Sequence, residues 1–219
     1  GLFGGKVSPF STAWADIGGH KYVMGAGFGR MDNTVTYKTP TFAGFNLLAQ
    51  YSFDKNVKKD DDAKTTGVQH GREGSAETDR QYALGATFAA GDLYLAGIVT
   101  QTNKQSVDYE GKSLGEQDDP LTVSLGGNYN FGVAKLYVAG QYFKDSNIAV
   151  PALQDKQISE TFGVQYNGYG MTVGADVPAF GGTAKALVGY MNAEDQAEKD
   201  AHDMQRYVFS VGYEYPLSK

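Results

Sequence analysis

Charged side chains of both signs lie in residues 7–30, a glycine-rich stretch with no strand pattern. They are Asp16, His20, Lys21 and Arg30. Fixed charges that face one another across a water-filled passage sort ions and polar solutes, which is one chemistry that this set could perform. The same composition also fits an ordinary solvated surface loop, so the residues alone leave both interpretations open.

The residue types that usually carry catalysis or hold metals occur without the spacing that such sites need. The chain has no cysteine, which excludes a disulfide framework, a thiolate zinc site and a thiol nucleophile. The three histidines, His20, His70 and His202, match no metal-binding motif, and no GxSxG sequence marks a serine hydrolase. The sequence therefore predicts a protein that is not an enzyme, with no catalytic residue, no metal site and no cofactor.

Two further patterns suggest ligand sites but lack a defining part. Gly25–Gly29 is as rich in glycine as a phosphate-binding loop, but it has no GK[ST] ending and precedes a predicted strand. Acidic clusters such as Asp60–Asp62 do not fit the EF-hand spacing, and nearby lysines favour solvated loop tips. The net charge of −6 argues against a nucleic-acid partner.

Strands must position these residues, because apolar side chains recur at every second position along much of the chain. In 45–53 and 121–131 the odd positions are mostly apolar, and 80–88 and 205–215 each show one apolar face. Such alternation predicts strands with one apolar face. No sustained 3.6-residue stripe predicts a long helix, and no run of about 18 apolar residues predicts a transmembrane helix.

Nine strands are predicted, joined alternately by tight turns and by long charged loops. This arrangement predicts an all-β, antiparallel up-and-down meander and is typical of an outer-membrane β-barrel. The predicted strands are 31–39, 44–53, 79–90, 92–102, 120–131, 134–144, 158–178, 183–192 and 204–216, with a stub of another at 1–6.

One predicted strand, 158–178, is irregular. Its apolar residues change from even to odd positions at Asn167–Gly168. This dipeptide fits either a two-residue hairpin turn or a β-bulge. A bulge preserves the alternation of turns and loops along the chain, so we favour the bulge.

Strand parity separates an aromatic, apolar face from a polar one. If Val35 and Tyr37 face lipid, Lys38 and the other polar strand residues face inward. Aromatic residues near the strand ends on the apolar face are typical of the interfacial girdles of membrane barrels. The solvent face of a soluble sandwich is the alternative for the polar side. The charged residues assigned to it are Lys38, Asp79, Asp176, Lys185, Arg206 and Glu214.

Three stretches resemble the trimeric general porins of Gram-negative bacteria, of the β-proteobacterial and neisserial type. They are Asp32–Phe45 (DNTVTYKTPTFAGF), Gly168–Gly174 (GYGMTVG) and Tyr213–Lys219 (YEYPLSK). The resemblance implies a 16-stranded transmembrane barrel in the cell outer membrane. It also implies passive diffusion of ions and small hydrophilic solutes through a water-filled channel, a homotrimer, and contact with outer-membrane lipid.

The resemblance also assigns roles within the chain. It makes 1–219 a single porin domain, incomplete at both ends because porins of this family are longer. It makes 7–30 the loop that folds inward and narrows the pore, with Asp16 and Lys21 near its narrowest section. Basic wall residues then favour a weak preference for anions. A soluble all-β, lectin-like carbohydrate-binding module is the alternative, and it would bury its apolar face against a second sheet.

Overall fold

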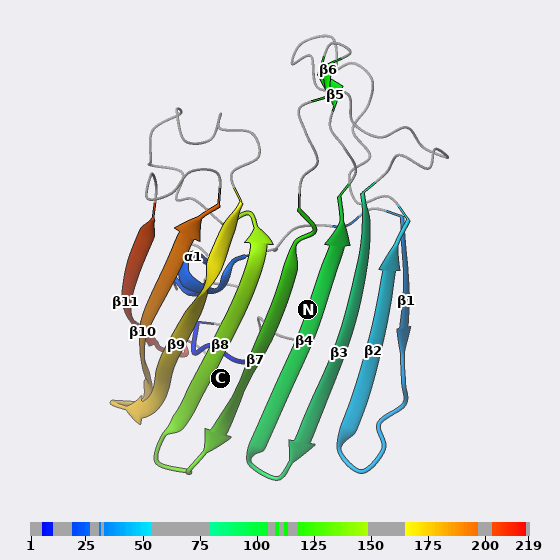
Figure 1. Cartoon of the computed structure of the whole chain (residues 1–219). Helices are drawn as coiled ribbons and strands as arrows, with labels where there is room; N and C mark the ends of the chain where they lie inside the picture. Colours follow the sequence, from blue (N-terminus) through cyan, green and yellow to red (C-terminus); the bar gives the residue numbers. More distant parts are fainter. Residues whose placement is uncertain are drawn as a thin grey trace.

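Nine antiparallel strands form one curved sheet in which each strand pairs with its neighbours along the sheet in the order β1-β2-β3-β4-β7-β8-β9-β10-β11 (Figure 1). The computed structural model describes residues 6–10, 19–26, 31, 33–53, 79–104, 108–109, 112–113, 118–148, 165–196 and 203–217. The strands of the sheet are β1 (Thr34–Lys38), β2 (Phe45–Ser52), β3 (Arg80–Ala90), β4 (Leu93–Asn103), β7 (Leu121–Asn130), β8 (Lys135–Ser146), β9 (Tyr166–Ala179), β10 (Gly182–Asp195) and β11 (Met204–Glu214).

Each of the nine predicted ranges overlaps one of these strands, so the predicted meander is confirmed, although β4, β8, β9 and β10 extend one to three residues past the predicted bounds. Two small elements were not expected: a hairpin of β5 (Asp108–Tyr109) and β6 (Lys112–Ser113), and the helix α1 (His20–Met24). The predicted stub at 1–6 and the start of the strand predicted at 158–178 fall largely outside the described residues. No helix in the described residues is long and apolar enough to cross a membrane.

The turns match the twist of the strands they join. Ala179 pairs with Gly182 across Phe180 and Gly181, which have φ values of +49° and +80°. Two successive positive φ values are those of a type I′ turn, whose twist suits a hairpin and which favours glycine. This turn fixes the register of β9 against β10.

The irregularity predicted at Asn167–Gly168 lies in the neighbouring strand. On its β10 side, β9 pairs without interruption through Asn167 and Gly168, so there is no hairpin there. On the other side, Phe143 pairs with Gly168 but Ser146 pairs with Tyr166, so two residues of β8 oppose one of β9. The bulge is therefore in β8, and its placement in β9 was wrong.

The parity change that suggested this bulge has another cause. Tyr166 is apolar yet faces the polar side of the sheet, where it is 7% exposed within an apolar cluster. Its neighbours two to six positions along, such as Gly170 and Thr172, share that side. An inward apolar residue had been taken as an outward one.

The two faces of the sheet differ as strand parity predicts. Outward side chains in mid-strand remain exposed, with Leu84 at 67% and Val211 at 64%. Inward positions on the neighbouring residues hold buried polar groups such as Ser124 and Gln141. Within the part of the chain that the structure describes, the apolar face is therefore not packed against a second sheet, as a lectin-like sandwich would require.

Aromatic residues border this exposed apolar face near the strand ends. At the end with the tight turns, the ring centroids of Phe45 and Phe88 lie 4.5 Å apart. Toward the opposite end, those of Tyr190 and Tyr207 lie 5.0 Å apart. Amphipathic rings at both borders of an apolar band are typical of strands that cross a bilayer.

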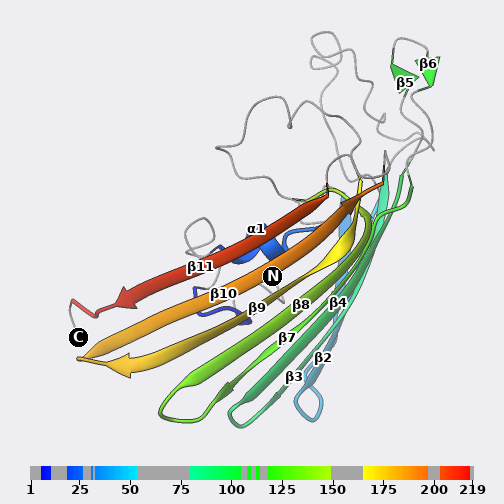
Figure 2. The same cartoon turned by 60° about the vertical axis from the view of Figure 1, so that its left-hand side comes forward.

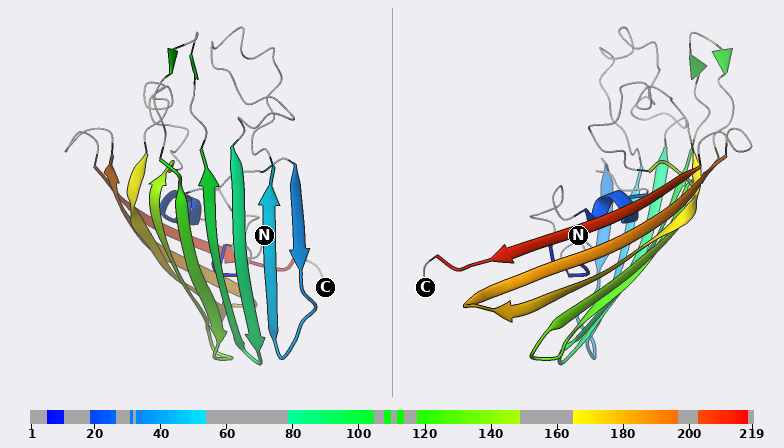
Figure 3. Two further views of the ribbon diagram at one scale, coloured as in Figure 1. Left: turned by 45° about the vertical axis from the view of Figure 1, so that its right-hand side comes forward. Right: turned by 90° about the vertical axis from the view of Figure 1, so that its left-hand side faces the viewer.

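The sheet curves around α1. Figure 2 and the right-hand view of Figure 3 show β11 in front of the other strands and α1 within the bend of the sheet. Helix α1 contacts β9, β10 and β11. The concave face of the sheet is the one that carries the inward polar residues.

Candidate functional site

Residue 6 and the two described pieces of the glycine-rich stretch, residues 7–10 and 19–26, lie on the concave face. Residues 6–10 and 19–26 together are called the inner segment here. Its first piece contacts Gly174 and Gly212 in β9 and β11, and its second contacts Gly170 and Gly189 in β9 and β10. Much of the segment is thus bound to one part of the sheet, the strands from β8 to β11.

Glycines in the wall let the backbone of the inner segment approach closely. A Cβ atom at Gly170 would overlap the Val23 carbonyl oxygen and lie 2.8 Å from its carbonyl carbon. A Cβ atom at Gly212 would lie 2.9 Å from Cε1 of Phe10. Both distances are too short for any side chain, so these glycines leave the space that the segment occupies.

An apolar cluster on the concave face holds the inner segment against the wall. Val23 and Met24 of α1 are buried against Phe143 and Met191 of the wall, and each is at most 1% exposed. Burying such side chains stabilises the attachment by roughly 1.5–3 kcal/mol each. This cluster explains why inward positions that were expected to be polar carry large apolar residues.

Polar side chains of four wall strands also bind main-chain groups of the segment. Three of them donate to one carbonyl oxygen each, and the amide of Gln141 both donates to and accepts from the same residue. The contacts are Asn128 Nδ2 to Lys6 O (2.6 Å), Gln141 Nε2 to Ala26 O (3.0 Å), Ala26 N to Gln141 Oε1 (3.0 Å), Lys185 Nζ to Pro9 O (3.1 Å) and Arg206 Nη1 to Tyr22 O (3.3 Å).

Lys185 lies in a small charged cluster. Its Nζ is 3.4 Å from Oδ1 of Asp176 and 3.3 Å from Oε2 of Glu214. The Tyr137 hydroxyl donates to the other oxygen of Asp176 at 2.8 Å. One ammonium and two carboxylates leave this cluster with a net charge of −1.

His20 is the buried titratable group of α1. Its Nδ1 is 3.4 Å from Oγ1 of Thr172, and its Nε2 has no hydrogen-bond partner in the described part of the chain. Burial lowers the pKa of His20 from 6.5 to about 4, so the ring is neutral at pH 7. The next residue, Lys21, lies with its ammonium 5.2 Å from the centre of the Tyr22 ring.

The predicted site residues thus fall into three sets. His20, Lys21, Asp176, Lys185, Arg206 and Glu214 share the concave side of β9–β11 with α1. Lys38 and Asp79 belong to the other half of the sheet, where Asp79 forms a 3.0 Å ion pair with Lys104. Asp16 and Arg30 lie outside the described residues.

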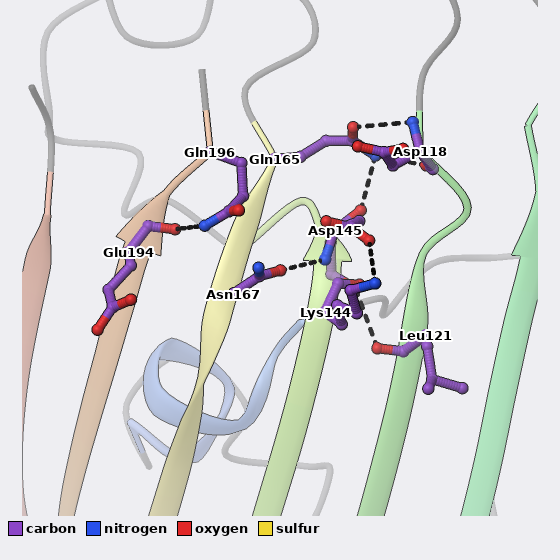
Figure 4. Close-up of polar contacts among 9 residues, drawn as sticks. Asp118, Leu121, Lys144, Asp145, Gln165, Asn167, Glu194 and Gln196 are labelled. Atoms are coloured by element: carbon purple, nitrogen blue, oxygen red, sulfur yellow. Dashed lines mark hydrogen bonds and ion pairs between the residues drawn. The ribbon is translucent and has the colours of Figure 1, made fainter. Parts of the chain in front are cut away.

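A polar network at the loop end of the sheet was missed by sequence reasoning (Figure 4). Gln165 donates through Nε2 to the carbonyl oxygens of Asp118 and Asp145, each at 2.7 Å. The N–H of Asp145 donates to Oδ1 of Asn167 at 2.7 Å, across the bulge in β8. The Asn167–Gly168 dipeptide was the one sequence signal near this network.

Comparisons with known proteins agree with this geometry. The family model for Gram-negative porins matches residues 1–219. An outer membrane porin protein of Bordetella pertussis is 28% identical over 229 residues, in an alignment that covers 98% of this chain and 56% of the relative. The chain therefore spans little more than half the length of that relative.

Proposed function

The chain belongs to the Gram-negative porin family, and from that premise we propose that the full-length protein is a general diffusion porin. It forms a water-filled channel in the cell outer membrane, through which ions and small hydrophilic solutes pass down their gradients. The channel is closed by about 16 strands, of which the described residues of this chain supply nine. Like other channels of this kind, it performs no catalysis, and three copies assemble into a homotrimer in contact with outer-membrane lipid.

The difference between the two faces of the sheet carries this proposal. A band of exposed apolar side chains bordered by aromatic rings suits the hydrocarbon of a bilayer. The concave face carries amides, hydroxyls and charges, which suit water. A strand in lipid must also have its main-chain groups paired, and the meander pairs each inner strand on both sides.

The inner segment supports a narrowing of the channel on one side. We propose that 7–30 is the constriction loop and that Asp16 and Lys21 face the narrowest passage. Arg30 and Lys38 contribute further fixed charge to it. Charges within about a Debye length of a permeating ion, roughly 8 Å at physiological salt, bias which ions pass.

Reconstitution of the full-length protein tests the proposal directly. In planar bilayers it is expected to give stepwise ohmic currents that grow in proportion to salt concentration. In liposomes it is expected to admit small sugars at rates that fall with solute size and do not saturate. Saturable uptake of one sugar would favour a specific transporter, and sugar binding without any current would favour a soluble carbohydrate-binding module.

A further inference from the structure

The two basic wall residues nearest the inner segment direct their donors at its main chain. Lys185 Nζ binds the carbonyl oxygen of Pro9, and Arg206 Nη1 binds that of Tyr22. Resting on the proposed channel function, we propose that Lys185 and Arg206 are positioning residues. They hold the inner segment at a set distance from the wall and thereby determine the width of the passage rather than its charge selectivity.

The carbonyl groups that these cations bind need partners from the wall. Tyr22 lies in α1, which has only five residues, and the last four carbonyls of a helix have no partner within it. A cation beside the last turn also suits the negative end of the helix dipole. Arg206 therefore supplies the hydrogen-bond donor for the Tyr22 carbonyl oxygen that α1 itself does not provide.

Neutral residues perform the same task on neighbouring strands. Asn128 binds the carbonyl of Lys6, and Gln141 binds both the N–H and the carbonyl of Ala26. An amide brings no net charge to the wall. The four wall side chains thus share one feature, a donor directed at a carbonyl oxygen of the inner segment. This shared feature indicates that Asn128, Gln141, Lys185 and Arg206 all hold the segment in place.

The charge of Lys185 is already balanced where it lies. Asp176 and Glu214 are each within 3.4 Å of its ammonium, and its side chain is only 11% exposed. The cluster has a net charge of −1, so a passing anion meets no positive surplus from it. This weakens the sequence-based argument for anion preference as far as it depended on Lys185.

Two variants of the full-length protein separate the attachment of the inner segment from the net charge of the cluster around Lys185. Lys185→Met with Asp176→Asn removes one charge of each sign, so the net charge of the cluster stays at −1 while the bond to Pro9 is lost. Asparagine still accepts the hydrogen bond from Tyr137. Glu214→Gln does the reverse, because it changes the net charge to zero and leaves Lys185 bound to Pro9.

Single-channel recordings then give opposite expectations for the two. Loss of a charge-assisted hydrogen bond is expected to raise the population of molecules whose inner segment is released from the wall by roughly tenfold to a hundredfold. The double variant is therefore expected to show added open-channel noise and altered conductance with an unchanged reversal potential. Glu214→Gln is expected to shift the reversal potential and keep the wild-type noise. A double variant with wild-type noise and conductance would overturn the proposal for Lys185.

Cross-linking tests Arg206 without depending on conduction. The chain contains no cysteine, and a Cβ atom at Gly19 would lie 3.5 Å from Cβ of Val208, which is within disulfide range. The φ value of Gly19 is +68°, so a cysteine there is strained. To cancel the effect of this strain, the same Gly19→Cys/Val208→Cys pair is compared with and without Arg206→Met. Adding Arg206→Met is expected to reduce the disulfide yield on mild oxidation. The molecules that do cross-link are expected to show the open-channel noise of the wild type.

The cross-linking result stays informative if the channel proposal fails. A protein that conducts no ions but still loses disulfide yield with Arg206→Met would refute the proposed function alone. Equal yields with and without Arg206→Met, in protein whose circular dichroism shows an intact β-sheet, would overturn the positioning role even in a conducting channel. If Lys185→Met with Asp176→Asn does not fold, this Arg206 comparison decides whether basic wall residues position the inner segment.

Discussion

Adding one methyl group at Gly170 is expected to displace the inner segment from the wall. A Cβ atom there would lie 2.8 Å from the Val23 carbonyl carbon and would overlap the carbonyl oxygen. Two carbon atoms in contact need about 3.5–4.0 Å. Gly170 lies in the middle of a strand paired on both sides, so α1 must move away from the wall by about 1 Å or more in Gly170→Ala.

The energetic consequence follows from the contacts that this movement stretches. The bond from Arg206 to Tyr22 is already 3.3 Å long, and the two bonds between Gln141 and Ala26 are 3.0 Å each. A net worth of about 0.5–1.5 kcal/mol for each of the two neutral bonds, and about 1.5–3 kcal/mol for the charged one, gives roughly 2.5–6 kcal/mol in total. Some loss from the apolar cluster around Val23 adds to this.

Single-channel conductance and noise measure this displacement in the full-length protein. Gly170→Ala is expected to lower the conductance, because the segment moves inward, and to add open-channel noise. Gly140→Ala is the matched control, since a Cβ atom there meets nothing closer than 3.9 Å. If both variants conduct like the wild type, the close packing of α1 on β9 is refuted.

Three further predictions follow from single residues. Because burial lowers the pKa of His20 from 6.5 to about 4, attachment of the segment should weaken as the pH falls from 6.5 toward 4, by at most about 3 kcal/mol. The open-channel noise should therefore increase at low pH, and His20→Gln should remove that increase. The same increase in His20→Gln as in the wild type would show that His20 is not its cause. Leu84→Arg, at a mid-strand lipid-facing position that is 67% exposed, should destabilise the folded barrel by about 2–4 kcal/mol in urea titrations, whereas Phe53→Arg at a strand end should cost about 0–1 kcal/mol; equal costs would argue against a bilayer around this face. Lys38, which forms no ion pair among the described residues, should contribute to selectivity, so Lys38→Glu should shift reversal potentials toward cations more strongly at 0.1 M than at 1 M salt; a shift independent of salt would contradict this.

The sheet could be predicted from the sequence because its determinants are local. Alternation along each strand sets which face is apolar, and tight turns set the register of neighbouring strands. The turn at Phe180–Gly181 even pairs Asp176 with Lys185 directly across β9 and β10. That ion pair was within reach of sequence reasoning, which assigned both residues to the inner face without pairing them.

The position of the inner segment could not be predicted in this way. Gln141 and Ala26 are 115 residues apart in sequence, and no periodic pattern links them. Helix α1 is too short for a hydrophobic stripe. Tyr166 misled the assignment of faces, because an apolar residue beneath the segment looks in sequence like one that faces lipid. Contacts between the wall and the segment depend on the three-dimensional fold as a whole.

Adjacent cysteines on β1 test most directly whether the concave face lines water and the convex face contacts lipid. The native chain has no cysteine to interfere. Val35 is outward and 62% exposed, while its neighbour Thr36 points to the opposite face. Thr36→Cys and Val35→Cys are each placed in the full-length protein and treated with a charged, membrane-impermeant thiol reagent during bilayer recording. Stepwise changes of current with Thr36→Cys and none with Val35→Cys are predicted. Reaction at Val35→Cys with no effect at Thr36→Cys would contradict the assignment of the two faces and the channel built on it.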